Sequence, residues 1–324
     1  MSVTTRSLEG GDAGSLTRLI ERCYGDTYPY EEFYDPAELR RLIEAGRLRS
    51  VIALDGDEVI GHTGMTLREA GAAVPEAGIT VVDPDRRGQG VLRELGIALV
   101  ERCRDEGFAG FVHYPTTAHE VMQKASVRFG GVETGVLLGY IPEDTDYRAV
   151  EDERTSGRLA ATVAYQPIGS LDPQDVVLPG RHAELLAGLY EEIGAERGFR
   201  TAGDADGSSA VESRFSPREG LLRVSVQRIG AELGATLDRL LAKHAGVEVI
   251  HADLPLADLA VGAAVEELGE RGFFFGALLP ALGRADLLRL QRLTDPRAAA
   301  FQPRVANRGA RRVLDHIRAD AGVG

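Results

Sequence analysis

A glycine-containing stretch at residues 81–95, VVDPDRRGQGVLREL, is the clearest sign of chemistry in this sequence. Its apolar start predicts a strand, and the residues from Val91 onward follow a helical pattern. A strand that passes through such a loop into a helix presents backbone N–H groups and the positive end of the helix dipole to solvent. Gly88 and Gly90 would let a diphosphate approach the backbone, and Arg87 could screen its charge.

The spacing of the glycines leaves two interpretations open. The loop lacks the Gly-Lys-Ser/Thr ending of a nucleoside triphosphate loop, and Arg93 stands where a complete G-x-G-x-x-G would need its last glycine. The loop is therefore either an anion site or a turn that only joins a strand to a helix.

The elements around this loop predict a mixed α/β fold. Residues 50–67 alternate apolar and polar side chains on both sides of an Asp-Gly turn, which predicts a hairpin. Apolar runs elsewhere predict further strands, and amphipathic runs predict helices. The predicted strands are 3–8, 76–83, 108–114 and 132–141, and the predicted helices are 12–23, 91–106 and 118–130.

The same order of elements returns after a polar stretch at 142–157. At a fixed offset of 138 residues, similar residues recur on the same predicted elements. The sets are Glu94, Leu95, Gly96, Leu99, Val112 and His113 against Glu232, Leu233, Gly234, Leu237, Ile250 and His251. We therefore predict two copies of one fold, residues 1–145 and 158–324, with a linker at 146–157. Chance similarity of amphipathic helices is the alternative.

The stretch 81–95 resembles the acyl-CoA pyrophosphate loop of the GNAT superfamily of N-acyltransferases. The family pattern is Arg/Gln-x-x-Gly-x-Gly/Ala after a strand that ends in Val-x-Pro; Arg87 and Gly90 match it, whereas Leu92 departs from it. The order of elements over residues 3–141 is also similar to this family. YGDTYPYEEFYDP, FFFGALLP and DLLRLQRL further resemble a subset of bacterial two-domain GNAT proteins.

The resemblance implies two tandem GNAT-like domains, each a mixed, mainly antiparallel sheet flanked by helices. It implies transfer from an acyl-CoA, acetyl-CoA in the first place, to a small-molecule amine. The main chain at Val81 and Val82 would pair with the pantetheine amides. The pyrophosphate would be held by Arg87, Gly88, Gln89, Gly90, Val91 and Leu92. At the 138-residue offset Val226 and Arg228 replace the two glycines, so we expect one donor site per chain.

Acylating an amine requires removal of a proton from the amine, because amines have a pKa of about 8 to 10. The thiolate that leaves must in turn gain a proton. Glu76 stands where GNAT proteins often carry a base, and a solvated strand-end carboxylate is the alternative. His119 is a second candidate base. The usual general acid is a tyrosine four residues before the glycine that ends this helix, and Ser126 stands there. Tyr114 is a possible substitute, or Tyr140; His113 is interpreted as a hydrogen-bonded core residue.

A tyrosine-rich segment lies in the region that shapes the acceptor cleft of GNAT proteins. Its candidate acceptor-binding residues are Tyr28, Tyr30, Glu31 and Tyr34. An acidic aromatic rim would suit a cationic amine, whereas a packed surface loop is the alternative. The final stretch, 301–322, is the one locally basic segment, and we predict a solvated helix there.

Composition excludes several classes of function. The net charge of -13 disfavours nonspecific binding to nucleic acid, although a tRNA-borne donor stays open. Two cysteines in helical patterns indicate neither disulfides nor a metal site. No apolar stretch approaches the roughly 20 residues that span a bilayer, and no signal peptide is recognised, so we expect a cytoplasmic monomer or homodimer. A noncatalytic acyl-CoA-binding regulator and a transferase that uses a carrier-protein donor are the alternatives.

Overall fold

The structure is a computed structural model that describes residues 3–68, 71–145, 157–294 and 302–322. In the first half the elements are β1 (Val3–Ser7), α1 (Ala13–Tyr24), η2 (Glu31–Tyr34), α2 (Pro36–Glu44), β2 (Arg49–Asp55), β3 (Glu58–Thr66), β4 (Glu76–Val82), η3 (Pro84–Arg86), α3 (Val91–Asp105), β5 (Gly110–His113), α4 (Val121–Arg128) and β6 (Val132–Ile141), with a 3-10 turn at Gly10–Asp12. The helices and strands predicted for residues 3–141 are confirmed.

The second half continues with a matching alternation of strands and helices. Its elements are β7 (Leu159–Pro167), β8 (Gln174–Val177), η4 (Gly180–His182), α5 (Ala183–Ile193), β9 (Arg197–Arg200), β10 (Ala210–Ser216), β11 (Leu221–Arg228), α6 (Leu233–Lys243), β12 (Val249–Pro255), α7 (Val261–Glu270), β13 (Phe274–Leu279), β14 (Leu287–Leu293) and α9 (Arg308–Ala321). The strands β8, β9 and β10 were not predicted, because each is short or largely exposed and shows no clear apolar alternation.

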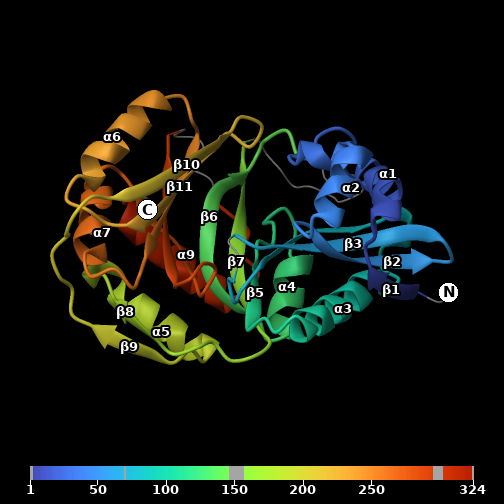
Figure 1. The fold of residues 1–324 in the computed structure, drawn as a ribbon, viewed down its shortest axis with the longest axis horizontal. Helices are drawn as coiled ribbons and strands as arrows, with labels where there is room; N and C mark the ends of the chain where they lie inside the picture. Colours follow the sequence, from blue (N-terminus) through green and yellow to red (C-terminus); the bar gives the residue numbers. More distant parts are fainter. Residues whose placement is uncertain (1–2, 69–70, 146–156, 295–301, 323–324) are drawn as a thin grey trace.

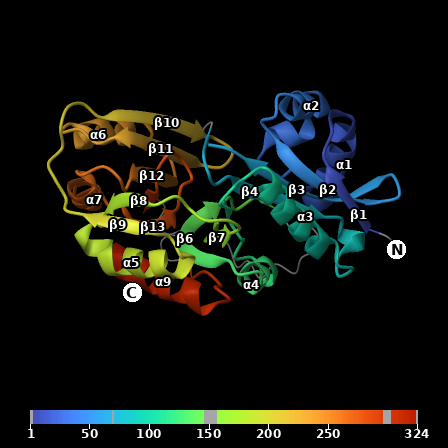
Figure 2. The ribbon, with the colours of Figure 1, turned by 60° about the horizontal axis from the view of Figure 1, so that its bottom comes forward.

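One twelve-stranded sheet runs through both halves. Its order is β1-β2-β3-β4-β5-β7-β6-β13-β14-β12-β11-β10. Only the β4/β5 and β11/β12 pairs in it are parallel. The predicted fold class, a mixed and mainly antiparallel sheet flanked by helices, is confirmed. The two halves lie side by side in Figures 1 and 2, with β6 and β7 at the centre of the molecule.

The central strands of the first half are buried on both faces. Along β2, Ile52 and Leu54 belong to the apolar cluster that packs α1, whereas Val51 and Ala53 belong to the cluster that packs α3. Because side chains alternate across a strand, these successive apolar residues bury both faces at once. Figures 1 and 2 show the result: α1 and α2 cover one face of β1–β4, and α3 covers the other.

Strand β7 lies within the sheet of the first half, although it comes after the expected linker. It pairs with β5 on one side and β6 on the other. These residues belong to the predicted second domain, 158–324, but their pairing places them between two strands of the first half. The expected linker, 146–157, lies outside the described residues except for Gly157.

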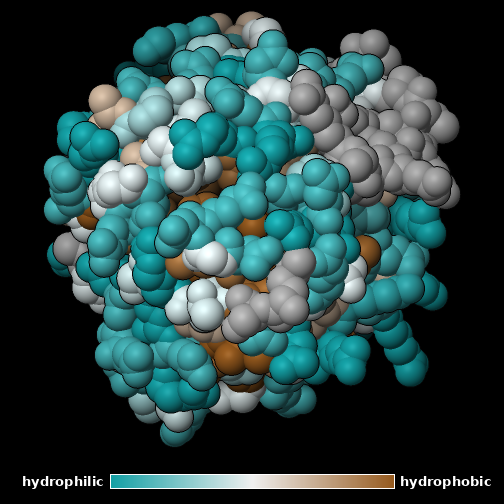
Figure 3. Space-filling view, turned by 90° about the vertical axis from the view of Figure 1, so that its right-hand side faces the viewer, coloured by the Kyte–Doolittle hydropathy of each residue, from teal (hydrophilic) through white to brown (hydrophobic). Residues whose placement is uncertain are grey.

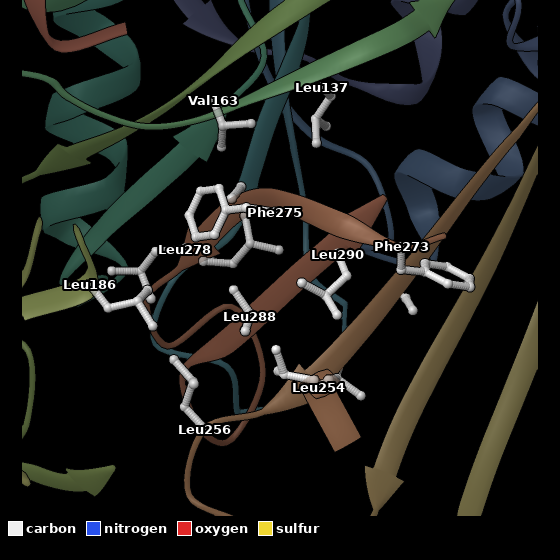
Figure 4. Close-up of a cluster of buried hydrophobic side chains, with 14 of the residues drawn as sticks. Leu137, Val163, Leu186, Leu254, Leu256, Phe273, Phe275, Leu278, Leu288 and Leu290 are labelled. Atoms are coloured by element: carbon white, nitrogen blue, oxygen red, sulfur yellow. The ribbon is translucent and has the colours of Figure 1, made fainter. Parts of the chain in front are cut away.

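The second half repeats the pairing pattern of the first. In the first half, β3 and β4 are antiparallel, β4 and β5 are parallel, and β5, β7 and β6 follow as antiparallel neighbours. In the second half, β10 and β11 are antiparallel, β11 and β12 are parallel, and β12, β14 and β13 follow as antiparallel neighbours. Figure 4 shows apolar side chains of β12, β13 and β14 below Leu137 and Val163 of the central strands. One buried cluster thus connects the two halves.

The halves join along β6 and β13. Their one register pair is Gly135 with Ala277, and a Cβ on Gly135 would collide with Ala277. Gln291 on β14 bridges the join, since its side chain donates to the Val136 carbonyl and accepts from the Leu138 amide at 2.9 and 2.8 Å. These contacts use buried main chain, so the two halves form one packed unit.

Helix α9 covers this join. Its residues Ala310, Val313, Leu314 and Ile317 are buried, and Glu133 on β6 accepts hydrogen bonds at its N-terminal end. The solvated helix expected for this segment is therefore wrong in one respect: its arginines lie on the outer side of an amphipathic helix whose other side packs on the sheet. No helix in the described ranges is long and apolar enough to cross a membrane.

Candidate active site

The two strands before and after the glycine loop separate to form a cleft. β4 and β5 pair only at Glu76 with Val112 and at Ala77 with His113. In the second half, β11 and β12 pair over five successive positions. The early end of pairing in the first half opens a cavity of about 1150 Å³, lined by β4, the glycine loop, the end of β5, α4 and the tyrosine-rich segment.

A bulge in β4 shapes the cleft wall. Ile79 has φ +57, a left-handed conformation that costs a β-branched residue on the order of 1–3 kcal/mol. The register with β3 shifts here, and the buried His62 holds the bulge by donating from Nδ1 to the Ile79 carbonyl at 2.8 Å. The hydroxyls of Thr63 and Thr80 lie 2.9 Å apart beside it. Ile79 and Thr80 line the cavity as a result.

Buried histidines predict a loss of stability in acid. Burial lowers the pKa of His62 to about 4, and burial first and then His316 lower that of His182 to about 4. Between pH 4 and 6.5 the unfolded chain therefore binds more protons, so stability falls as pH falls through this window and is unaffected above it. We expect each histidine to cost about 2 kcal/mol between pH 7.5 and pH 5, measured by urea unfolding.

The His62→Gln variant provides the control for this pH effect. Its amide can still donate to the Ile79 carbonyl, but it has no proton to gain in this window. The difference in unfolding free energy between pH 7.5 and pH 5 is then smaller by about 2 kcal/mol. An equal pH dependence in both proteins would show that His62 is not buried in its neutral form.

The glycine loop has the geometry of an anion site. After η3, Gly88 and Gly90 have φ +74 and +85, conformations that favour glycine. The first backbone bonds of α3 run from the amides of Arg93 and Glu94 to the Gly90 carbonyl, which leaves the preceding amides outside the helix ladder. These amides and the start of α3 border the cavity, where a negative group would be stabilised.

The expected donor-site residues occupy different places around this loop. Of these expected residues, all but Gln89 line the cavity: Val81, Val82, Arg87, Gly88, Gly90, Val91 and Leu92. Gln89 is exposed, and its side-chain amide donates to the Asp85 carbonyl at 3.0 Å, so it braces the loop from outside. A nearby thiol, Cys23, also lines the cavity; burial raises its pKa to about 11.

Leu92, which departs from the family pattern, does not lie inward beside Leu95, because Val91 fills that position and packs with Leu95. Leu92 is half-buried and lines the cavity. Because α3 begins at Val91, as predicted, Val91 and not Leu92 is buried against the sheet.

The second half has no comparable loop in its described residues. In the first half Glu76 pairs with Val112, and in the second half Leu222 pairs with Ile250. The connection between the two parallel strands is therefore eight residues shorter in the second half than in the first. Val226 and Arg228, which the sequence offset placed in a loop, both lie on β11. The amides of Ile229 and Gly230 come directly after β11 and donate to Asp258 and to Ser209 at 2.9 Å each. A Cβ on Gly230 would collide with the backbone at Ser209.

Two catalytic candidates form a hydrogen-bonded pair. The Tyr114 hydroxyl donates to Glu76 Oε1 at 2.7 Å. Burial first, and then the carboxylate of Glu76, raise the pKa of Tyr114 well above its usual value, so the phenol stays protonated. Tyr114 lines the cavity, whereas Glu76, with 29% of its side chain exposed, is not among the described residues that line it. The carboxylate can therefore reach a bound molecule through the phenol.

The other two catalytic candidates, His119 and Ser126, do not lie together: only His119 lines the cavity. His119 lies in the loop before α4 and lines the cavity, rather than starting the helix as expected. Ser126 is buried on the sheet side of α4, where its Oγ atom is 2.9 Å from His113 Nε2. It is not among the described residues that line the cavity, so the serine cannot take the place of the tyrosine acid. His113 is hydrogen-bonded as expected, but it is half-buried and lines the cavity, so its interpretation as a core residue is wrong.

The tyrosine-rich segment divides between the cavity and the second half. Tyr28 and Tyr30 line the cavity, with ring centroids 5.4 Å apart. Glu31 and Tyr34 face Arg218 instead: its guanidinium carbon is 5.9 Å from the Tyr34 ring centroid, and Nη1 is 3.7 Å from Glu31 Oε1.

Residues of the second half also reach the cavity, which the sequence did not predict. Glu219 lines it and forms a two-bond ion pair with Arg223, at 2.7 and 2.8 Å. His251 stacks on Tyr140, another lining residue, with centroids 5.8 Å apart. No sequence signal marks Glu219, because its role depends on contact between segments far apart in the chain. On the face shown in Figure 3, the coloured surface is mostly hydrophilic, and hydrophobic residues are visible in narrow gaps.

Within the described ranges, no group of three or more His, Cys, Asp or Glu residues could hold a metal ion. The site instead offers backbone amides, arginines, a phenol and a carboxylate. These groups can bind an anion, orient an acyl group and accept a proton.

Comparisons with known proteins point to one family for the first half. Residues 14–130 match the model of the acetyltransferase (GNAT) family. No curated protein sequence matches the chain.

Similar solved structures span about half of the chain. The ribosomal-protein-S18-alanine N-acetyltransferase of Escherichia coli is 17% identical, with a TM-score of 0.41, over 53% of this chain and 97% of the other. A phosphinothricin acetyltransferase from Sinorhizobium meliloti, in complex with acetyl-CoA, is 22% identical, with a TM-score of 0.42, over 52% and 90%. The ribosomal-protein-S5-alanine acetyltransferase of Vibrio fischeri is 12% identical, with a TM-score of 0.42, over 53% and 97%.

Proposed function

We propose that this chain is an N-acetyltransferase that moves an acetyl group from acetyl-CoA directly to a small-molecule amine; the match of residues 14–130 to the acetyltransferase (GNAT) family model supports this proposal. The observation that carries the proposal is one cavity that touches both the glycine loop and Tyr114, the phenol bonded to Glu76. The loop supplies an anion site, and the pair supplies a path for the amine proton.

The donor would lie along β4. The amides that precede α3 and the Arg87 side chain suit the pyrophosphate, and the edge of β4 beyond Ala77, where pairing with β5 has ended, suits the pantetheine amides. The conformations at Gly88 and Gly90 support the same placement. The match of residues 14–130 to an acetyltransferase family supports acetyl as the acyl group.

The reaction needs one proton path and one leaving group. The amine nitrogen attacks the thioester carbonyl, a carbon–nitrogen bond forms, and the carbon–sulfur bond breaks. The Tyr114 hydroxyl accepts the amine proton as it passes its own proton to Glu76 across the 2.7 Å bond. The sulfur leaves as a thiolate and takes a proton from solvent, because the buried Ser126 is bonded to His113 and does not reach the cavity.

The acceptor would occupy the end of the cavity nearest the second half. Tyr28, Tyr30 and Tyr140 line it together with Glu219. Aromatic faces attract cations, and a carboxylate stabilises an ammonium group, so this lining favours a small amine that carries positive charge.

We also propose that the second half is a degenerate copy that binds no CoA. The repeated pairing order supports a copy, and the shorter connection with its occupied amides supports the loss of a donor site. In this assignment the first domain extends to Pro167, because β7 completes its sheet.

Release of free thiol from acetyl-CoA tests the function. A panel of small mono- and diamines, with an alanine-first peptide as a protein-like acceptor, would be followed by a thiol-reactive dye. We expect at least one small cationic amine to accelerate release about 100-fold or more over buffer. Activity confined to the peptide would replace the acceptor class. Tight acetyl-CoA binding without release for any amine would favour the noncatalytic regulator.

A further inference from the structure

Arg68, in the loop after β3, lies between the candidate base of the first half and a buried ion pair of the second half. Its Nη2 atom is 2.6 Å from Asp253 Oδ2. Its Nε atom is 3.9 Å from Glu76 Oε1, the same oxygen that accepts the Tyr114 hydroxyl. A single guanidinium therefore contacts both halves beside the reaction path.

The ion pair that anchors Arg68 is rigid and buried. Asp253 on β12 and Arg289 on β14 are 3% and 2% exposed, and they make two hydrogen bonds of 2.7 and 2.9 Å. Burial alone would raise the pKa of Asp253, but the guanidiniums of Arg289 and Arg68 lower it well below its usual range. The carboxylate that holds Arg68 is therefore charged at every pH at which the enzyme would work.

Charge balance links Arg68 to Glu76. Among the described residues, two guanidiniums face the single carboxylate of Asp253, so one positive charge is left over, and the other carboxylate within 4 Å of Arg68 is that of Glu76. The titratable and charged groups around Glu76 come from several elements. They are Tyr30 before η2, Arg68 after β3, Tyr114 after β5, Tyr140 on β6 and Arg289 on β14.

We propose that Arg68 is a positioning residue, held by Asp253 of the second half, that orients Glu76 and stabilises it as a carboxylate beneath Tyr114. This inference rests on the proposed role of Glu76 as the proton acceptor. It gives the second half a task in the reaction although it binds no donor: its buried Asp253 fixes how strongly Arg68 acts on Glu76. A merely structural bridge would give the same ion pairs without any effect on the base.

The two ends of the bridge have opposite expected effects on the pH profile. Arg68→Met removes the cation beside Glu76, so the acid limb of kcat moves to higher pH by about 0.5 to 1 unit. Asp253→Asn leaves Arg68 with Glu76 as its remaining carboxylate partner in the described part of the chain, so the acid limb moves to lower pH by a similar amount. Acetyl-CoA affinity stays within about twofold in both variants, since neither residue touches the glycine loop.

A double-mutant cycle tests the same inference without any acceptor. Urea unfolding of Arg68→Met, Glu76→Gln and the double variant measures whether the two residues interact. We expect the changes in unfolding free energy of Arg68→Met and Glu76→Gln to be non-additive. A control cycle uses Glu101→Gln, which changes an exposed carboxylate on α3, in place of Glu76→Gln, and there we expect the changes to add. If Asp253→Asn fails to fold because Arg289 loses its partner, the pH profile of Arg68→Met and the double-mutant cycle still test the positioning role.

The outcomes separate the two proposals. Thiol release by the native protein with acid limbs that stay in place or move in the same direction would overturn the positioning role and leave the function standing. Additivity in the Arg68/Glu76 cycle would overturn it as well. Non-additivity in a protein that releases no thiol with any amine would show that Arg68 and Glu76 interact, but it would reject the transferase and with it the positioning role.

Discussion

Gly90→Asp abolishes acetyl-CoA binding, with a loss of affinity of about 100-fold or more by calorimetry, or about 2.7 kcal/mol. Gly90 precedes the first residue of α3 and has φ +85, so any side chain there is strained. The aspartate would also bring a negative charge to the amides that we assign to the pyrophosphate. A Cβ at this position meets no protein atom within 4 Å, so the new group enters the space intended for the ligand.

Gly107→Asp is the matched control for this effect. Gly107 lies just beyond the opposite end of α3, has φ +75, and also has no atom within 4 Å of an added Cβ. It therefore carries the same backbone strain and the same new charge without bordering the cavity. We expect its acetyl-CoA affinity to stay within about twofold of the native value.

The same titration counts the donor sites. We expect the native protein to bind one acetyl-CoA per chain, and Arg228→Ala to bind it equally well, because Arg228 lies on β11 and its guanidinium bonds the Ser208 carbonyl, away from the cavity. Two equivalents, or equal losses from Gly90→Asp and Arg228→Ala, would contradict the assignment of a single site to the first half.

Local sequence patterns predicted the strand, loop and helix around residues 81–95 because each depends on neighbours in the chain. The apolar run of β4, the two glycines and the start of α3 are all explained by periodicity and backbone conformation. The same reasoning missed the bulge at Ile79, since a β-branched residue with positive φ is stabilised by His62, seventeen residues earlier on another strand. Local propensity cannot show such a compensation.

Long-range pairing explains the remaining differences. The polar composition of 142–157 suggested a boundary before residue 158, because an apolar strand begins directly after it; the sheet nevertheless takes β7 between β5 and β6. A fixed offset placed Val226 and Arg228 opposite the loop glycines, because an offset cannot represent a deletion. Register shows that the deletion lies between the paired strands, where the first half has its loop. Glu219 and Arg68 gained their candidate roles only through contacts between halves.

Glu76→Gln is expected to lower turnover about 100-fold or more, while acetyl-CoA affinity stays within about twofold. The amide has the size of the carboxylate, and its oxygen can still accept the Tyr114 hydroxyl, so the geometry at 2.7 Å is preserved. The variant loses the ability to take a proton at neutral pH. Glu101→Gln, which removes an exposed carboxylate of the same half, leaves turnover unchanged.

Tyr114→Phe distinguishes a relay from a direct base. If the amine proton reaches Glu76 through the phenol, removing the hydroxyl interrupts the same path, so the loss in kcat is about as large as in Glu76→Gln. The double variant is then no slower than either single one, because residues that act as a unit are non-additive. A direct base gives a different result: Tyr114→Phe retains most of the turnover, and the two losses multiply. Unchanged turnover in Glu76→Gln would remove Glu76 from the reaction altogether and transfer the role of base to His119, which lines the same cavity.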